Sequence, residues 1–336
     1  MNLSLRHGVA AAALFATGVL LAPGAARAGS YTFATINNPA DVTFNQLLGI
    51  NNGGTIAGYF GSGAAGHPNQ GYTVAPPYAS YTAENFPGSV QTQVTGLNNN
   101  GTTVGFWSTS NLGVGLDPNF GFVHQGSTFT SVNDPLGAGS PAVNQLLGIN
   151  DNNIAVGFYN DAANTAHAYA YAIAAATFTP ITVASATATT ATGINDNSLV
   201  SGFFTNGAGN TLGFLENLNG TGLTTFEAPG STNTMFLGVN GSGEAVGVYT
   251  DAAGLTHGLT FSAGVFTSID DPFGIGTTTI NGVNDHGQLV GFYTDGQGNV
   301  DGLLADPVPE PPAMGMLAVA VLLLGTLRGV LRHLRA

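Results

Sequence analysis

The sequence contains no cysteine and little charge. Without cysteine, the chain can form no disulfide, no thiolate metal site and no cysteine nucleophile. Charged residues make up 7% of the 336 residues, against about 25% in typical soluble domains. All five basic residues lie in the terminal segments, so no Lys or Arg occurs from Gly29 to Leu327. Because proteins bind phosphates mainly through these two residues, the sequence argues against a nucleic-acid partner.

All 18 acidic residues lie in this stretch without Lys or Arg, and the net charge of the chain is −13. Two interpretations stay open. The acidic surface keeps an extracellular protein soluble, or the carboxylates bind a divalent cation such as Ca²⁺, the one cofactor that the sequence leaves open. The apolar share of 43% is sufficient to build a buried core.

Common catalytic signatures are also missing. The sequence has no G-x-S-x-G and no H-E-x-x-H motif. The segment GSGAAG at 61–66 has the glycine spacing of a dinucleotide site, but His67-Pro68 follows it where that site needs a helix. The five histidines outside the terminal segments have no metal-ligand spacing. We therefore predict no catalytic residue.

The first 28 residues have the features of a secretory signal peptide. Arg6 gives a positive start, and Val9 to Leu21 form a short apolar run. Ala26 and Ala28 have the small-x-small pattern of a signal peptidase site, so we predict cleavage after Ala28. The alternative is a retained membrane anchor, which the short run and the cleavage site disfavour.

The C-terminal segment, residues 307–336, combines a short motif, an apolar run and a basic tail. In order, these are Pro309, Glu310 and Pro311, then Ala313 to Leu327, then Arg328, Arg332 and Arg335. A helix over the run would rise about 22 Å, less than a bilayer core of about 30 Å, and arginine side chains can extend it by snorkelling. Positive charge after the run predicts a transmembrane helix with a cytoplasmic C-terminus.

These three parts resemble the PEP-CTERM sorting signal of Gram-negative bacteria. The resemblance implies that an exosortase recognises and cleaves the chain near the motif, after transient anchoring in the inner membrane. It also implies export to the cell surface or extracellular matrix of a species that makes exopolysaccharide or biofilm. A plain C-terminal membrane anchor is the alternative.

Between these two segments, residues 29–306 contain six repeats. Each repeat has a leading glycine, an asparagine two residues later and a second glycine nine residues after the first. The leading glycines are Gly49, Gly96, Gly148, Gly193, Gly238 and Gly282, at steps of 47, 52, 45, 45 and 44 residues. Self-similarity at this period indicates propeller blades or solenoid coils.

Each repeat is consistent with four short strands. In the last complete repeat these are the run before Asn240, the run around Gly247, HGLTF at 257–261 and VFTSID at 265–270. The sixth repeat ends at GLLADP, 302–307, and lacks a fourth strand, whereas YTFATINNP at 31–39 is a fourth strand with no repeat before it. A ring explains the spare strand and a linear solenoid does not. We predict an all-β, six-bladed β-propeller of four-stranded antiparallel blades, closed by the N-terminal strand.

The repeated glycines and asparagines have structural explanations. The leading glycines fit an innermost strand where backbones approach closely, or they lie in β-bulges. The asparagines precede turns and can bond to the backbone two residues on. Alternatively, the six asparagines line a channel mouth as a ring.

The repeat region also resembles the extracellular HAF repeat proteins, over residues 31–304. That family repeats a Gly-Ile-Asn turn, a Val-Gly-Phe/Tyr strand and a His-Ala-Phe motif. His167-Ala168-Tyr169 and His257-Gly258-Leu259 are the two best copies of the last motif, and the other four blades lack the histidine. The likeness implies location and fold more than an activity.

The best calcium candidate is the segment DGQGNVD at 295–301, which offers Asp295, Asn299 and Asp301. The simpler interpretation is that these residues form turns. Three functions stay open. The first, which we favour, is a non-catalytic surface or matrix protein that binds polysaccharide. The others are an extracellular lyase or hydrolase acting on polysaccharide and a calcium-stabilised module.

Overall fold

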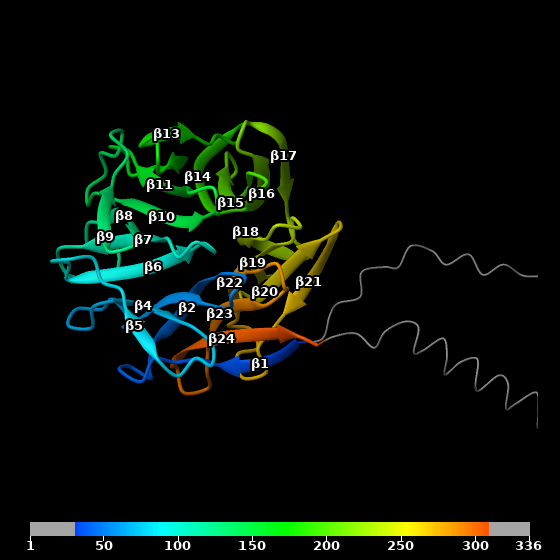
Figure 1. Ribbon diagram of the computed structural model, residues 1–336. Coiled ribbons are helices and arrows are strands. Elements are labelled where there is room, and N and C mark those ends of the chain that lie inside the picture. The colour runs from blue at the N-terminus through cyan, green and yellow to red at the C-terminus, as the bar shows by residue number, and fades with distance from the viewer. Residues whose placement is uncertain (1–30, 309–336) are drawn as a thin grey trace, which may run out of the picture.

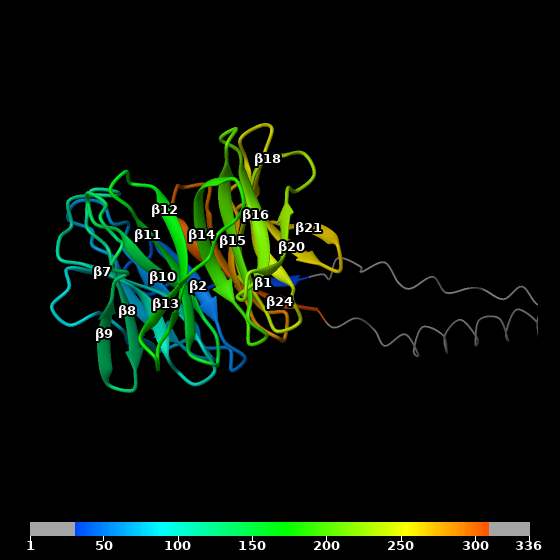
Figure 2. The same ribbon diagram turned by 90° about the horizontal axis from the view of Figure 1, so that it is seen from above.

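Each sequence repeat forms one sheet of four antiparallel strands in the computed structural model, which describes residues 31–308. The six sheets follow one another around a central axis, as Figures 1 and 2 show. The prediction of a six-bladed β-propeller is therefore confirmed. The period of the repeats and the strand count within each one carried this prediction.

The first three blades follow the chain in order from the inner to the outer strand. The first contains β2 (Asn45–Ile50), β3 (Ile56–Phe60), β4 (Gln70–Val74) and β5 (Tyr81–Ala83). The second contains β6 (Gln91–Leu97), β7 (Thr103–Ser108), β8 (Phe120–Gln125) and β9 (Thr128–Val132). The third contains β10 (Asn144–Ile149), β11 (Ile154–Asn160), β12 (Ala166–Ala172) and β13 (Thr177–Pro180).

The last three blades repeat this order, except that the sixth takes its outer strand from the start of the chain. The fourth contains β14 (Ala186–Ile194), β15 (Leu199–Asn206), β16 (Thr211–Asn217) and β17 (Thr221–Phe226). The fifth contains β18 (Ser231–Val239), β19 (Ala245–Asp251), β20 (Thr256–Ser262) and β21 (Val265–Ile269). The sixth contains β22 (Thr279–Val283), β23 (Leu289–Thr294), β24 (Val300–Pro307) and β1 (Tyr31–Thr35).

Ring closure depends on the pairing of β1 with β24. The two strands are antiparallel, with Tyr31 opposite Pro307 and Thr35 opposite Leu303. The predicted closure by the N-terminal strand is thus confirmed. Figure 1 shows β1 beginning and β24 ending side by side at the right-hand side of the molecule.

The leading glycines form a ring around the axis. A Cβ added to any one of them would lie 2.9–3.3 Å from the Cα of the leading glycine in the next blade. Each also lies at a register shift between the first and second strands of its blade, as between Ile280 and Gly282. Both explanations offered by the sequence are therefore correct: the glycines allow close approach and occupy bulges.

The second glycines are required by these bulges. A Cβ on Gly157, Gly247 or Gly291 would lie 1.9 Å from a carbonyl oxygen of the neighbouring first strand. The same carbonyl approach occurs at the other three second glycines, at 2.0–2.4 Å. No side chain fits such a distance, so the two glycines of each repeat act together.

The core consists of apolar clusters between neighbouring blades. Val156 and Ala168 of the third blade, for example, pack in one cluster with Ala191 and Phe214 of the fourth. Five further clusters join the other neighbouring pairs around the ring. Burial of this apolar surface provides the main stabilisation of the ring.

The disc has two different faces. One face carries the turns between first and second strands, which begin at the repeated asparagines, and we call it the asparagine face. The opposite face carries the loops between second and third strands and the connections between blades, and we call it the pocket face. The ends of the described chain lie at the asparagine face, where Gln288 Nε2 donates to Asp306 Oδ1 at 2.6 Å.

Two predicted segments fall outside the described residues. These are the signal peptide with Ala26 and Ala28, and the sorting segment with its Pro-Glu-Pro motif and arginine tail. Within residues 31–308, no helix has the length and apolar character to cross a membrane.

Candidate functional site: a pocket across the first three blades

Long loops distinguish the first two blades from the others. The loops between second and third strands span residues 61–69 and 109–119 there, but only 161–165, 207–210, 252–255 and 295–299 in the remaining blades. The two long loops form walls of a cavity of about 570 Å³ on the pocket face. A cavity of this size is in the range of small-molecule sites.

The lining of this pocket combines aromatic rings with amide side chains. The aromatic residues are Phe44, Tyr59, Phe106 and Trp107, and the amides are Gln46, Asn69, Gln91, Gln93, Asn119 and Gln145. Mostly apolar walls with a few placed polar groups are typical of sites that bind an organic ligand. Asp117 is the one carboxylate of the lining.

Three of the glutamines occupy one repeated position. Gln46, Gln93 and Gln145 each lie three residues before a leading glycine, on the inner strands of adjacent blades. The same position in the other blades holds Thr190, Met235 and Thr279. The inner strands of the first three blades therefore present a set of amides to the pocket that the other blades do not have.

Each of these three amides is held by one hydrogen bond. Tyr59 donates its hydroxyl to Gln46 Oε1 at 2.7 Å. Gln93 Nε2 donates to Asn69 Oδ1 at 2.7 Å, and Gln145 Nε2 donates to Asn119 Oδ1 at 2.6 Å. Burial raises the pKa of Tyr59, so its hydroxyl stays protonated and remains a donor.

The other polar atom of each amide is free. Among the hydrogen bonds of residues 31–308, none involves Gln46 Nε2, Gln93 Oε1 or Gln145 Oε1. One end of each amide is thus fixed by the protein while the other is available to a ligand. Such an arrangement reduces the entropy lost on binding.

Asp117 lines the pocket and also secures the longer loop. It is buried and accepts hydrogen bonds from Ser110 Oγ, Leu112 N, Gly113 N and Gln91 Nε2 at 2.6–3.3 Å. Burial by itself would raise the pKa of Asp117, but these hydrogen bonds outweigh it and hold the pKa below its usual value. The carboxylate is therefore ionised at neutral pH.

Trp107 is packed firmly at the edge of the pocket. Its ring stacks on Phe86 with centroids 4.3 Å apart and an interplanar angle of 2°. Its Nε1 is buried and has no hydrogen-bond partner among the described residues. An unpaired buried donor is costly and unusual in a folded protein.

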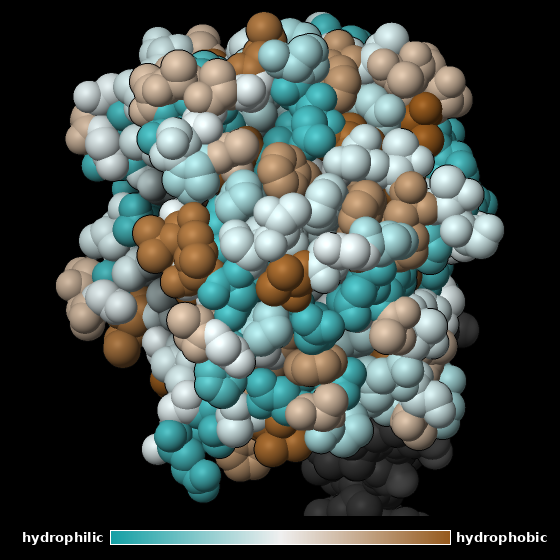
Figure 3. Space-filling model, turned by 90° about the vertical axis from the view of Figure 1, so that its left-hand side faces the viewer, coloured by the Kyte–Doolittle hydropathy of each residue, from teal (hydrophilic) through white to brown (hydrophobic). Residues whose placement is uncertain are grey.

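Exposed apolar side chains are concentrated on the pocket face. Those at loops of this face are Val42, Val90, Leu112, Val114, Leu116, Leu136, Leu255, Phe273 and Ile275. Val114, which lines the pocket, is the most exposed at 83%. Figure 3 shows the side that faces left in Figure 1, where hydrophobic residues lie in small groups among polar ones.

The asparagine face carries a closed ring of hydrogen bonds. The Nδ2 of each repeated asparagine donates to the backbone oxygen of the asparagine in the next blade, at 2.8–3.2 Å, and Asn284 completes the circle by donating to Asn51. The Oδ1 atoms accept backbone N–H groups of their own turns, as Asn195 does from Asn197 and Leu199. Each asparagine thus serves both the turn and the ring.

The residue after the repeated asparagine extends this pattern in every blade except the fifth, where it is Gly241. The side chains of Asn99, Asp151 and Asp196 accept backbone N–H groups from the preceding blade at 2.7–2.8 Å. Asp285 accepts in the same way from Gly241. The axial cavities here are small, about 100 and 70 Å³. We therefore assign the axial rings to architecture.

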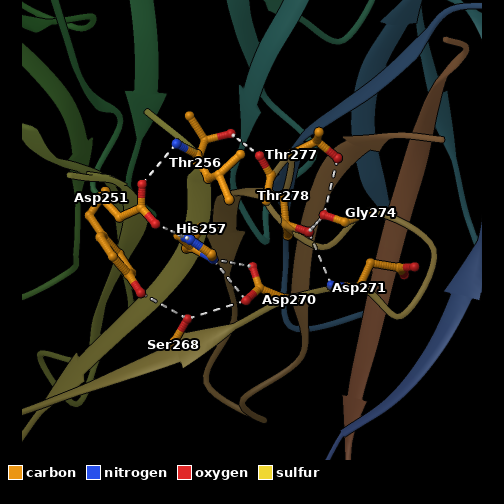
Figure 4. Close-up of polar contacts among 12 residues, drawn as sticks. Asp251, Thr256, His257, Ser268, Asp270, Asp271, Gly274, Thr277 and Thr278 are labelled. Carbon is orange, nitrogen blue, oxygen red and sulfur yellow. Dashed lines mark hydrogen bonds and ion pairs between the residues drawn. The ribbon is translucent and has the colours of Figure 1, made fainter. Parts of the chain in front are cut away.

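The two histidines of the HAF-like motif hold loops of their own blades. His167 Nε2 lies 2.9 Å from Asp161 Oδ2. His257 Nδ1 lies 3.0 Å from Asp270 Oδ2, and its Nε2 lies 3.5 Å from Asp251, as Figure 4 shows. Burial alone would lower the pKa of His257, but the two carboxylates outweigh this and raise it.

The calcium candidates do not form one cluster of side chains. Asp295 Oδ1 accepts from the backbone N of Gln297 and Asn299, and its Oδ2 accepts from Asn299 Nδ2 at 3.0 Å. Asp301 instead accepts from Asn37 Nδ2 at 2.6 Å, next to β1. Within residues 31–308, no three His, Asp or Glu side chains are arranged to hold a metal ion.

The pocket residues were not predicted from the sequence, although two irregularities of the repeats mark them. The steps of 47 and 52 residues contain the two long loops, whereas the other steps are 44 or 45. Glutamine occurs at its repeated position in only three of six blades. Departures from the repeat, rather than the repeat itself, locate the pocket.

Comparison with known proteins shows the fold and no family. No family model and no curated protein matches the chain. Among solved structures, a putative TolB from Agrobacterium tumefaciens has 13% identity and a TM-score of 0.51, covering 78% of this chain and 91% of that one. TolB from Acinetobacter baumannii has 8% identity and a TM-score of 0.48, covering 71% of this chain, which spans 60% of that one.

A six-bladed fungal lectin from Aleuria aurantia, described as recognising fucose, has 11% identity and a TM-score of 0.47, covering 81% of this chain and 99% of that one. The likeness to the Agrobacterium TolB, at 13% identity and a TM-score of 0.51, shows a shared fold alone. The protein is a six-bladed β-propeller whose site has to be interpreted from its own residues.

Proposed function

We propose that this chain is an exported, non-catalytic binding protein whose pocket holds extracellular polysaccharide. The observation that carries the proposal is the composition of the cavity of about 570 Å³, in which aromatic rings lie beside three glutamine amides that each have one polar atom without a hydrogen bond. Sugars have apolar faces that pack on aromatic rings and hydroxyls that bond to amides. The pocket provides both kinds of contact.

Export rests on the two terminal segments. The signal peptide directs the chain across the inner membrane, and the Pro-Glu-Pro segment is processed by an exosortase before release to the cell surface or matrix of a Gram-negative bacterium. The position of Tyr31 and Pro307 at the asparagine face supports this proposal. If the membrane anchored the chain at either terminus, the asparagine face would lie next to the membrane and the pocket face, on the opposite side of the propeller, would point away from it.

The pocket favours binding over polysaccharide hydrolysis. Most glycosidases need two carboxylic groups on either side of the scissile bond. Asp117 is the one carboxylate that lines this pocket, and its oxygens are occupied by hydrogen bonds within the loop. A catalytic pair is thus not assembled in this pocket.

Binding is tested with the full chain and immobilised bacterial exopolysaccharides. We expect retention of the protein, loss of retention in Gln93→Ala, and no appearance of new reducing ends. Gln297 lies exposed on the pocket face, in the loop between the second and third strands of the sixth blade, so Gln297→Ala is the control and should bind normally. Equal binding by both variants, or cleavage of the polysaccharide, would refute the proposal.

Export is tested by mass spectrometry of the protein recovered from culture medium and matrix. We expect an N-terminus at Gly29 and a C-terminus close to Pro309–Pro311. A chain that stays in the cytoplasm with residues 1–28 intact would contradict the export proposal but would leave the pocket untested as a binding site.

A further inference from the structure

We infer that the pocket selects uncharged glycans and rejects acidic ones such as uronate polymers; this inference rests on the proposed binding function. It goes beyond that function because a matrix contains both classes of polysaccharide. Selection of one class follows from which groups the pocket lacks and from how its amides are oriented.

The negative charge of the propeller disfavours an anionic ligand. No Lys or Arg occurs from Gly29 to Leu327, so no permanently cationic side chain of the described structure can pair with a uronate. The pocket wall itself carries the carboxylate of Asp117. Burying an anion against an acidic wall without a cation is unfavourable, because desolvation is not offset by an ion pair.

The free amide atoms fit hydroxyl groups better than carboxylates. Gln93 and Gln145 leave their Oε1 atoms free, and these atoms only accept hydrogen bonds. A sugar hydroxyl can donate to them, whereas an ionised carboxylate cannot donate and would face two carbonyl oxygens. Gln46 leaves Nε2 free as a donor, so a ligand that both donates and accepts satisfies all three.

Hydrogen bonds to the two long loops fix the orientation of the Gln93 and Gln145 amides. Asn69 and Asn119, which accept from Gln93 and Gln145, lie at the ends of the two long loops. Rotating either amide to present its NH₂ group to an anion would break that hydrogen bond and bring two oxygens together. The long loops therefore shape the pocket and also hold the amides in the orientation that accepts hydroxyls.

The test uses matched pairs of ligands with the full chain. Neutral hexasaccharides of glucose, galactose and mannose are each compared by calorimetry with the hexauronate of the same linkage. We expect at least one neutral member to bind and its uronate to bind at least about tenfold more weakly. Raising NaCl from about 50 to about 500 mM should leave the neutral affinity unchanged, because no charge pair is involved.

Two variants locate the effect. Gln93→Leu removes the free acceptor at similar volume and should weaken neutral binding about tenfold, while Gln297→Leu on the same face should have no effect. Gln145→Lys adds a cation and should narrow the gap between uronate and neutral ligand.

The outcomes separate the inference from the proposed function. Uronates that bind as tightly as the neutral sugars and lose affinity in Gln93→Leu would overturn the inference and retain the binding function. Absence of binding by every ligand in both classes would overturn both.

Discussion

The two faces of the propeller differ in how regularly their residues and loops repeat from blade to blade. On the asparagine face, the same residue recurs in all six blades, and its hydrogen bonds close a circle from Asn51 through Asn284. On the pocket face, loops differ in length between blades, and three adjacent blades carry glutamines that the others lack. The regular face maintains the ring, and the irregular face has the features of a binding site.

Hydrogen-bond satisfaction differs in the same way. Each ring asparagine donates to its neighbour and accepts from its own turn, as Asn195 does with Asn240 and Leu199. The three glutamines at the repeated position, Gln46, Gln93 and Gln145, are each bonded at one end and free at the other. In this protein, the polar groups that are paired in every blade belong to the architecture, and the half-paired glutamines of three blades belong to the candidate site.

The largest expected effect is on the architecture that all blades share. Gly247→Ala would place a Cβ 1.9 Å from the carbonyl oxygen of Met235, so we expect a loss of more than about 4 kcal/mol or failure to fold. Gly296→Ala, where a Cβ meets no atom within 4 Å, should change stability by less than about 0.5 kcal/mol. Thermal melts of the two variants check this, and similar melting temperatures would contradict the bulge explanation.

A smaller loss is expected from breaking the asparagine ring. Asn195→Ala removes a donor to Asn240 and an acceptor for two turn N–H groups, which should cost about 3 kcal/mol at this buried position. Asn219 forms an exposed turn without a ring contact, so Asn219→Ala should cost only about 1 kcal/mol. Denaturant unfolding measures both. Equal losses would show that the turn alone matters and that the ring adds nothing.

Exchanging a loop on the pocket face should separate binding from stability. Replacing residues 109–119 by the short loop 207–210 removes Asn119 and Asp117, so glycan affinity should fall at least about tenfold. The fold should lose no more than about 2 kcal/mol, since the blades keep their apolar contacts. Calorimetry and melting of the same sample measure both effects, and unchanged affinity would remove the long loop from the site.

The smallest expected effect depends on pH and concerns the fifth blade. Because the pKa of His257 is raised in the folded state, its pairing with Asp270 and Asp251 stabilises the protein below the unfolded histidine pKa of about 6.5 and is lost as pH rises through the folded value. His257→Gln should therefore lower the melting temperature by about 1 °C near pH 5 and not at all near pH 8.5. His167→Gln, with the single partner Asp161, serves for comparison. A larger effect at high pH would reverse the assigned direction.

The fold was predictable because its determinants recur. The glycine and asparagine positions repeat six times, and the unpaired strand at 31–39 indicates where the ring closes. The dual role of the asparagines was less accessible, since turn formation alone explained each copy. Their contact with the next blade depends on the ring radius, which no single repeat specifies.

The pocket could not be predicted from residue types alone. Gln93 and Asn69 are 24 residues apart, and only the blade geometry brings them together. Trp107 looks like an ordinary strand residue in the sequence, yet it stacks on Phe86 from a blade connection. Two signs were accessible in the sequence: the longer steps between repeats, because an insertion in a repeat must emerge at a loop, and the glutamines at one repeated position of three blades.

Fluorescence of Trp107 gives the most direct test, because this is the single tryptophan of the chain and it lines the pocket. Titration with the tightest neutral hexasaccharide should change its emission saturably, with the midpoint found by calorimetry. Binding heat without any change in emission would place the ligand elsewhere and contradict the assignment of function to the irregular face.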